Sequence, residues 1–394
     1  PSDPDGAGLL LPIPVSFMRK VWRPLCGELP DTFAIGQVFL PDDDAVRREL
    51  ETLAEKIFSA HGLKLLGWRD TPVRKEILGA HALATCPAIR QCLVVPDNSR
   101  APAQGAAVTE NAGDETGEAF ERLLYIARRH LENSARAEFP EQAEAFHVAS
   151  LSGSSLVYKG LLHGGKLSAF YQDLTDRDFA VHFAVLHERY STNTQPAWRL
   201  AQPFHCLAHN GEINTIACNR ANMAIREPLL ASPLYGEDIR HLLPVLDSLG
   251  SDSAMLDNSL EFLLHGGRSL AHAAMMLVPE PFGSSFIMGE DKRAFYEYHA
   301  AFMEPWDGPS ALVFTDGRRQ LGAMLDRNAL RPCRYAQTKD GLVIPASEAG
   351  VLELPDSSIA RRGRVNPQTS DMIDCARTRG LTDVEAERRV SQAQ

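Results

Sequence analysis

Residues 187–215 read HERYSTNTQPAWRLAQPFHCLAHNGEINT, a stretch that is rich in polar side chains. The run before it, Phe179–Leu186, alternates β-branched, aromatic and small residues and predicts a half-buried strand. The stretch closes on Asn210-Gly211, a turn signal between two apolar runs. Buried donors and acceptors need hydrogen-bond partners, so the stretch is either a hydrated surface loop or the wall of a binding site.

Each part of the stretch also has an ordinary structural interpretation. Asn-Gly most often marks a hairpin turn, because both residues tolerate positive φ. A single arginine at a strand end, here Arg189, is usually solvated or paired with a surface carboxylate. The interpretation as a binding site therefore depends on the whole string.

The whole string resembles the glutamine amidotransferase domain of glutamate synthase large subunits. That family carries R-[FY]-S-T-N-T-x-P-x-W-x-L-A-Q-P-F, followed by A-H-N-G-E-I-N-T. Further strings of this sequence agree with the family, and the resemblance extends from Asp5 to about Pro367. They are GSDS at 250–253, MEPWDGP at 303–309, LDRNALRP at 325–332 with Ala329 in place of the usual glycine, and ASEAG at 346–350.

The totals are those of a globular chain with a sizeable core. Its 394 residues are 44% hydrophobic and 23% charged, and its net charge of −11 disfavours nucleic acid or an anionic membrane as a partner. No apolar run approaches the roughly 20 residues of a membrane span. The seven cysteines are scattered and form no CxxC pair, which is typical of a reduced, cytoplasmic protein, and their spacing suggests no zinc site.

Periodicity predicts a mixture of helices and strands. Residues 97–117 are expected to form a surface insertion and Arg128–His130 a solvated helix face. The turn Leu249–Ser253 is expected to supply an Asp or Ser cap to a helix that starts near Met255. The predicted helices are 42–60, 118–135, 219–227 and 260–277, the last broken at Gly266-Gly267, and the predicted strands include 33–40, 311–314 and two within 146–160.

The resemblance implies an α+β fold of the N-terminal-nucleophile hydrolase type. In this fold two stacked antiparallel sheets lie between helix layers, giving a four-layer αββα sandwich. We expect residues 1–380 to form one class II glutamine amidotransferase domain and residues 381–394 to form a polar helical tail or linker.

The resemblance also implies a site for L-glutamine. Asn210 and Gly211 match the family's donors to the negative oxygen of the tetrahedral intermediate. Arg189 matches the guanidinium that binds the α-carboxylate, and Asp252 matches the carboxylate that binds the α-ammonium group.

The family's nucleophile is an N-terminal cysteine, whereas position 1 of this sequence is proline. We therefore expect the nucleophilic cysteine to lie outside the 394 residues, and these residues alone to be inactive. The alternatives are a glutamine-binding pseudoenzyme, an interaction domain without a ligand, and a class II amidotransferase that serves another acceptor.

No metal or flavin is expected in this chain. In the family, ammonia passes to a separate synthase domain or subunit that carries FMN and an iron–sulfur cluster and aminates 2-oxoglutarate. That synthase part is the expected partner.

Overall fold

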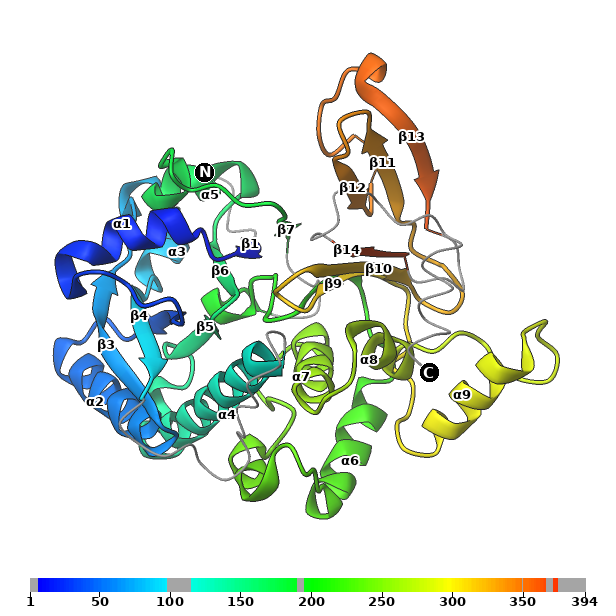
Figure 1. Ribbon diagram of the computed structural model, residues 1–394, viewed down its shortest axis with the longest axis horizontal. Helices are drawn as coiled ribbons and strands as arrows, with labels where there is room; N and C mark the ends of the chain where they lie inside the picture. Colours follow the sequence, from blue (N-terminus) through cyan, green and yellow to red (C-terminus); the bar gives the residue numbers. More distant parts are fainter. Residues whose placement is uncertain (1–5, 98–114, 190–194, 349, 366–370, 375–394) are drawn as a thin grey trace. The chain divides into compact units, whose positions relative to one another are not determined.

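The computed structural model describes residues 6–97, 115–189, 195–348, 350–365 and 371–374. Its strands pair in antiparallel fashion and are accompanied by helices, so the protein is α+β (Figure 1). The chain divides into two compact units. The first unit comprises Pro1–His205 and Leu229–Leu243, and the second comprises Cys206–Pro228 and Pro244–Gln394. None of the described helices has the length and apolar character needed to cross a membrane.

The larger sheet of the first unit has the strand order β3-β4-β2-β5. Two long amphipathic helices, α2 (Asp44–Ala60) and α4 (Glu115–Glu138), cover one face of it (Figure 1). Their apolar faces are buried against the sheet, which stabilises both helices more than propensity alone would. The strands are β2 (Ala34–Leu40), β3 (Leu63–Asp70), β4 (Ala88–Pro96) and β5 (His147–Ser152).

The second sheet of this unit has the order β6-β1-β7. The two strands predicted within 146–160 are present, but they belong to different sheets, and the chain crosses between the sheets at the turn Ser152–Ser155. Glu121 holds this turn, since its Oε1 accepts hydrogen bonds from Ser152 Oγ at 3.1 Å and from the Gly153 N–H at 3.0 Å. The strands are β1 (Gly6–Pro12), β6 (Ser155–Leu161) and β7 (Val185–Glu188).

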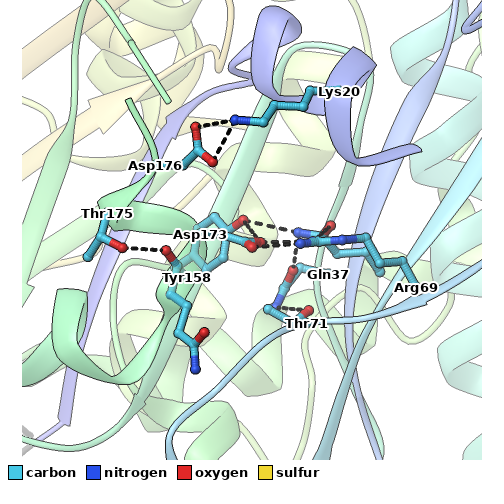
Figure 2. A network of polar contacts seen from close by, with 10 residues as sticks. Lys20, Gln37, Arg69, Thr71, Tyr158, Asp173, Thr175 and Asp176 are labelled. Atoms are coloured by element: carbon cyan, nitrogen blue, oxygen red, sulfur yellow. Dashed lines mark hydrogen bonds and ion pairs between the residues drawn. The ribbon is translucent and has the colours of Figure 1, made fainter. Parts of the chain in front are cut away.

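A buried polar network connects the two sheets (Figure 2). Arg69 of β3 forms an ion pair with Asp173, at 2.6 Å between Nη2 and Oδ1, and the same carboxylate accepts the hydroxyl proton of Tyr158 of β6 at 2.9 Å. Gln91 of β4 donates to the Tyr158 oxygen at 3.1 Å and to Gln37 of β2 at 3.0 Å. Because every member is paired, this network can occupy the interior without a large desolvation penalty.

The second unit contains a four-stranded sheet of order β14-β10-β9-β8 and a three-stranded sheet of order β12-β11-β13. Apolar side chains of α7 (Asp252–His265) and α8 (Leu270–Leu277) pack against β8, β9 and β10 and form the core of this unit. The strands are β8 (Leu207–Gly211), β9 (Ser310–Thr315), β10 (Gln320–Leu325), β11 (Arg334–Thr338), β12 (Val343–Ala346), β13 (Ile359–Arg364) and β14 (Asp371–Asp374).

The remaining α-helices of both units are α1 (Val15–Cys26), α3 (Ala80–Ala84), α5 (Leu167–Phe170), α6 (Ile216–Arg226) and α9 (Glu290–Ala300). The predicted helices 42–60, 118–135 and 219–227 correspond to α2, α4 and α6, and the break at Gly266-Gly267 separates α7 from α8. Most of the predicted insertion 97–117, and the predicted tail 381–394, lie outside the described residues. The prediction of a single domain over 1–380 and the four-layer arrangement of its sheets stay predictions.

Two predictions from the sequence are wrong. The strand expected at Phe179–Leu186 is confined to Val185–Glu188, because Phe179 is held by ring packing on Phe17, at 5.1 Å between centroids, and not by strand pairing. Arg128 and Arg129 are buried and not solvated, since both form ion pairs with Glu132, at 2.9 and 3.1 Å.

Candidate functional site

Asn210 and Gly211 form the last two positions of β8, where they pair with Ala311 and Ser310 of β9. The Asn-Gly pair therefore continues a strand and does not form the hairpin turn that is its commonest use. The start of the same strand is fixed by Asp257, whose Oδ1 accepts the N–H groups of Cys206 at 2.8 Å and Leu207 at 3.1 Å.

Only glycine can occupy position 211. Its φ is +144°, and a Cβ placed on it would lie 1.9 Å from the carbonyl oxygen of Pro309. The facing Gly308 has the same constraint, because its Cβ would lie 1.9 Å from the carbonyl oxygen of Glu212. The two backbones therefore approach at a distance that excludes a side chain at either position, so close backbone packing explains both glycines.

The side chain of Asn210 is half-buried, and its Nδ2 donates to Ser347 Oγ at 3.0 Å. Ser347 directly follows β12 and belongs to the ASEAG string. An amide NH2 group has two hydrogens, so the bond to Ser347 orients the group and occupies only one of them. The ASEAG string that contains Ser347 agrees with the family, but no local pattern assigns Ser347 a role in the site.

Asp252 is the first residue of α7, and the helix cap is its neighbour Ser251, whose Oγ accepts the N–H of Ala254 at 3.2 Å. The expectation of an Asp or Ser cap in Leu249–Ser253 is therefore confirmed, with Ser251 as the cap and Asp252 as the first helical residue. Asp252 lies in the first turn of α7, where the helix dipole stabilises its negative charge.

The carboxylate of Asp252 is tied to the loop that follows Gly211. Its Oδ2 accepts the N–H of Ile213 at 2.8 Å, and its Oδ1 accepts the N–H of Ser253 at 2.7 Å. Each oxygen retains further acceptor capacity. The second unit thus brings three of the four predicted site residues, Asn210, Gly211 and Asp252, to one loop and the helix terminus beside it.

The MEPWDGP string supports this loop from the other side. The carbonyl oxygen of Asp307 accepts the N–H groups of Asn214 at 2.8 Å and Thr215 at 3.3 Å, and the Asp307 N–H donates to Thr215 Oγ1 at 2.9 Å. The Asp307 carboxylate forms an ion pair with Arg327 at 2.5 Å. These contacts position the loop and give this string a structural role.

The LDRNALRP string forms a tight turn around Asp326, which is 1% exposed. The Asp326 carboxylate accepts the N–H groups of Ser310 and Asn328, each at 3.0 Å, so it joins the turn to the start of β9. Ala329, where the family has glycine, adopts φ +48°. The backbone at this position therefore requires the left-handed conformation that glycine adopts without strain.

Arg189, the fourth predicted residue, belongs to the first unit. It follows β7, its N–H donates to the Gly6 carbonyl oxygen at 2.7 Å, and its side chain is exposed. Its φ of +95° is unusual for a residue other than glycine and costs backbone energy. Residues 190–194, which complete its motif, lie outside the described residues.

The protein is thus α+β, with an amide side chain and a half-buried glycine at the end of β8 and a carboxylate at the N-terminus of α7 that is hydrogen-bonded to the loop after β8. The family model for glutamine amidotransferases of class II matches residues 1–394. The chain belongs to the class II glutamine amidotransferases.

Several known proteins are similar to the chain. It is 41% identical over 393 residues, or 99% of its length, to the glutamate synthase [NADPH] large chain of Bacillus subtilis, of which it covers 25%. It is 39% identical over 378 residues, or 94% of its length, to the glutamate synthase [NADH] of Saccharomyces cerevisiae, covering 17% of it. A ferredoxin-dependent chloroplastic glutamate synthase of Oryza sativa subsp. japonica is 38% identical over 395 residues, with 99% of the chain and 23% of the relative covered. The chain thus spans a quarter or less of these curated relatives.

Proposed function

We propose that this chain is the glutaminase part of a glutamate synthase, which hydrolyses the side-chain amide of L-glutamine to glutamate and ammonia. The observation that carries the proposal is the grouping of the Asn210 amide, Gly211 and the Asp252 carboxylate around one loop. Membership of the class II amidotransferases and the similarity to glutamate synthases support it. The N-terminal-nucleophile sandwich of two stacked sheets is part of the same proposal.

Asn210 and Gly211 would stabilise the oxyanion. When a thiolate attacks the amide carbon of glutamine, the carbonyl oxygen becomes negative and needs fixed donors. The bond to Ser347 holds the Asn210 amide in place beforehand, so little reorganisation accompanies the reaction. Collapse of the tetrahedral intermediate releases ammonia and leaves a thioester, and water then cleaves the thioester to glutamate and the free thiol.

Asp252 and Arg189 would recognise the two charges of the amino-acid end of glutamine. Asp252 would accept the α-ammonium group through the lone pairs that its backbone contacts leave over. Arg189 would bind the α-carboxylate through its guanidinium, whose paired N–H groups match a carboxylate. A free amide without these charges would bind more weakly, which gives selectivity for glutamine.

Four buried cysteines of the described residues are poor candidates for the attacking group, whereas Cys218 of α6 is exposed. The attacking form of cysteine is the thiolate. Burial raises the pKa of Cys86 to about 11 and that of Cys92 to about 12, so both remain thiols at neutral pH. Cys206 and Cys333 are buried as well.

We further propose that the ammonia serves a synthase domain or subunit that carries FMN and an iron–sulfur cluster and aminates 2-oxoglutarate. The support is the set of relatives, which are glutamate synthases. Their names differ in the electron donor, so the donor is not part of the proposal. A cytoplasmic location stays a prediction.

The test is the kinetics of glutamine hydrolysis by the intact protein and by its Asn210→Ala variant. Loss of one oxyanion donor lowers kcat by about 100- to 1,000-fold in enzymes of this kind, whereas KM should change little. The matched control is Asn222→Ala, a half-buried residue of α6 outside the proposed site, which should leave kcat unchanged. Glutamine binding without hydrolysis by the unaltered protein would favour the pseudoenzyme instead, and a protein that neither binds nor hydrolyses glutamine would favour the interaction domain.

A further inference from the structure

Three histidines that are far apart in sequence meet in the first unit. His61 follows the last residue of α2, His130 lies in α4, and His241 lies in the 3-10 helix Gly236–Leu242. The distance from His61 Nε2 to His130 Nδ1 is 2.9 Å, and the rings of His130 and His241 stack with centroids 3.8 Å apart. One ring nitrogen from each histidine lies within 4.8 Å of the other two.

The segment Leu229–Leu243, which returns to the first unit, is anchored so that it presents His241 to the other two rings. Asn133 of α4 donates from Nδ2 to the carbonyl oxygens of His241 and Leu243, both at 3.0 Å. At the other end of the 3-10 helix, the buried ring of Tyr235 packs against Tyr125 of α4 at 6.2 Å between centroids. The backbones that carry the three rings are therefore held independently of any bond between the imidazoles.

The surroundings of the three rings disfavour their protonation. Burial is the main cause that lowers the pKa of all three histidines, that of His130 to about 4. Neutral imidazoles offer a lone pair at neutral pH, as a metal ligand must.

We propose that His61, His130 and His241 form a binding site for a divalent transition-metal ion of the Zn²⁺ class. Imidazole nitrogens are common ligands for such ions, and three histidines leave a fourth position for water. Two nitrogens bound to one tetrahedral zinc at about 2.0–2.1 Å lie roughly 3.3 Å apart. The His61–His130 distance of 2.9 Å has to widen by a few tenths of an ångström when their hydrogen bond gives way to a shared metal ion. The stacked rings of His130 and His241 also have to rotate apart, because the lone pair of an imidazole lies in the plane of its ring.

Two charged side chains near His241 have opposite effects on the binding of a cation. Asp238 Oδ1 lies 3.9 Å from His241 Nε2 and favours a cation. Arg240 Nε lies 3.4 Å from the same nitrogen and disfavours one. The Arg240 side chain is exposed and can turn into solvent when an ion binds.

The simpler interpretation is a packing cluster held by ring stacking and hydrogen bonds. His272 and His299 of the second unit provide the comparison, since their Nε2 atoms lie 3.0 Å apart and no third histidine forms a ligand group with them among the described residues. A two-histidine pair supplies too few ligands for tight binding of zinc, so it is a matched control. The three histidines are too far apart along the chain for their spacing to predict a metal site.

The test is zinc binding by the intact protein after metal removal with a chelator, measured by calorimetry. The unaltered protein should bind an ion whose Kd is weakened at least about tenfold in the His241→Gln and His130→Gln variants, since even outer-shell partners contribute that much. His272→Gln should bind as the unaltered protein does, and Arg240→Gln should bind more tightly. Co²⁺ in place of Zn²⁺ should give the visible absorption of a tetrahedral site, absent from His241→Gln.

His241 is partly exposed, with 20% of its side chain accessible, so the His241→Gln variant is expected to fold. Zn²⁺ should raise the thermal midpoint of the unaltered protein and of His272→Gln, but not that of His241→Gln, because ligands stabilise the state that binds them. Equal affinity in the unaltered protein and His241→Gln, or no zinc binding by the unaltered protein, would overturn the proposal.

Discussion

The carboxylate of Asp252 accepts a hydrogen bond of 2.8 Å from the backbone N–H of Ile213, two residues beyond Gly211. The bond ties the N-terminus of α7 to the loop that leaves β8. A displacement of Asp252 would therefore also displace the loop beside Asn210 and Gly211. The proposed ammonium-binding group is thus also a positioning group for the oxyanion donors.

We expect Asp252→Asn to raise the KM for glutamine by about 10- to 100-fold, since a hydrogen bond to a charged group contributes about 1.5–3 kcal/mol. Asparagine keeps the shape of the side chain and an acceptor oxygen, but it removes the charge. Steady-state kinetics on the intact protein measures the effect. Asp291→Asn, at the exposed N-terminus of α9, is the matched control and should leave KM unchanged. An unaltered KM in Asp252→Asn would refute the assigned role.

Asp173→Asn should destabilise the first unit by roughly 3–5 kcal/mol, because the buried guanidinium of Arg69 would lose its counter-charge. Asp173 is 4% exposed and also accepts the Tyr158 hydroxyl, so the loss affects the contact between the two sheets. Urea unfolding measures the change.

The matched control for this prediction is Asp176→Asn, three residues further along the chain. Asp176 pairs with Lys20, whose side chain is 53% exposed, and the pair appears beside the buried network in Figure 2. Solvent screens such a pair, so its loss should shift the unfolding midpoint far less. Equal shifts for the two variants would show that the buried network does not stabilise this unit.

Ala329→Gly should stabilise the protein by about 0.5–1 kcal/mol. At φ +48° alanine is strained, and glycine relieves the strain at the cost of extra freedom in the unfolded chain and some packing of the methyl group. Thermal unfolding measures the difference. Ala336→Gly in β11, where φ is not positive, should instead destabilise, and stabilisation by both variants would contradict the backbone explanation.

The His272–His299 pair should make stability depend on pH. Burial is the main cause that lowers the pKa of His272 from 6.5 to about 4, with His299 and Arg268 as further causes. Between these values the unfolded chain binds a proton that the folded chain does not, so stability is full above about pH 6.5 and falls as the pH drops toward 4.

We expect His272→Gln to flatten this dependence by up to about one proton, measured as the slope of unfolding free energy against pH. His81→Gln, on the exposed surface of α3, is the control and should keep the slope of the unaltered protein. An unchanged slope in His272→Gln would contradict the prediction.

Local signals predict α2, α4, α6 and the region of α7 and α8, whereas α1, α3, α5 and α9 are not predicted. The amphipathic period and the Asp42–Asp44 cluster placed α2 almost to the residue, and Asp43 is its cap, with Oδ1 accepting the Ala45 N–H at 2.8 Å. The strand at Phe179 failed because an apolar run does not distinguish pairing in a sheet from ring packing. The burial of Arg128 is also not predicted by its sequence. Arginine and glutamate are residue types that are usually exposed, and only the fold buries Arg128 together with its partner Glu132.

The motifs that resemble the family predict the residues of the candidate site, but they do not predict the contacts between these residues. Asn210 and Asp252 came from the resemblance, whereas Ser347 and Ile213 as their partners required the fold, because 137 and 39 residues separate the members of each pair. The histidine cluster cannot be predicted from the sequence either, because its members are far apart along the chain. Its members come from two helices and from a returning segment whose place no local pattern encodes.

That returning segment also has a consequence for dissection of the protein. The chain passes from the first unit to the second after His205, goes back at Leu229, and departs again at Pro244. Three covalent passages thus join the two units, and no single cut yields either of them whole. A fragment that ends near residue 205 would lack the segment Leu229–Leu243, which carries His241 and belongs to the first unit. Truncation experiments therefore have to keep both units in one chain.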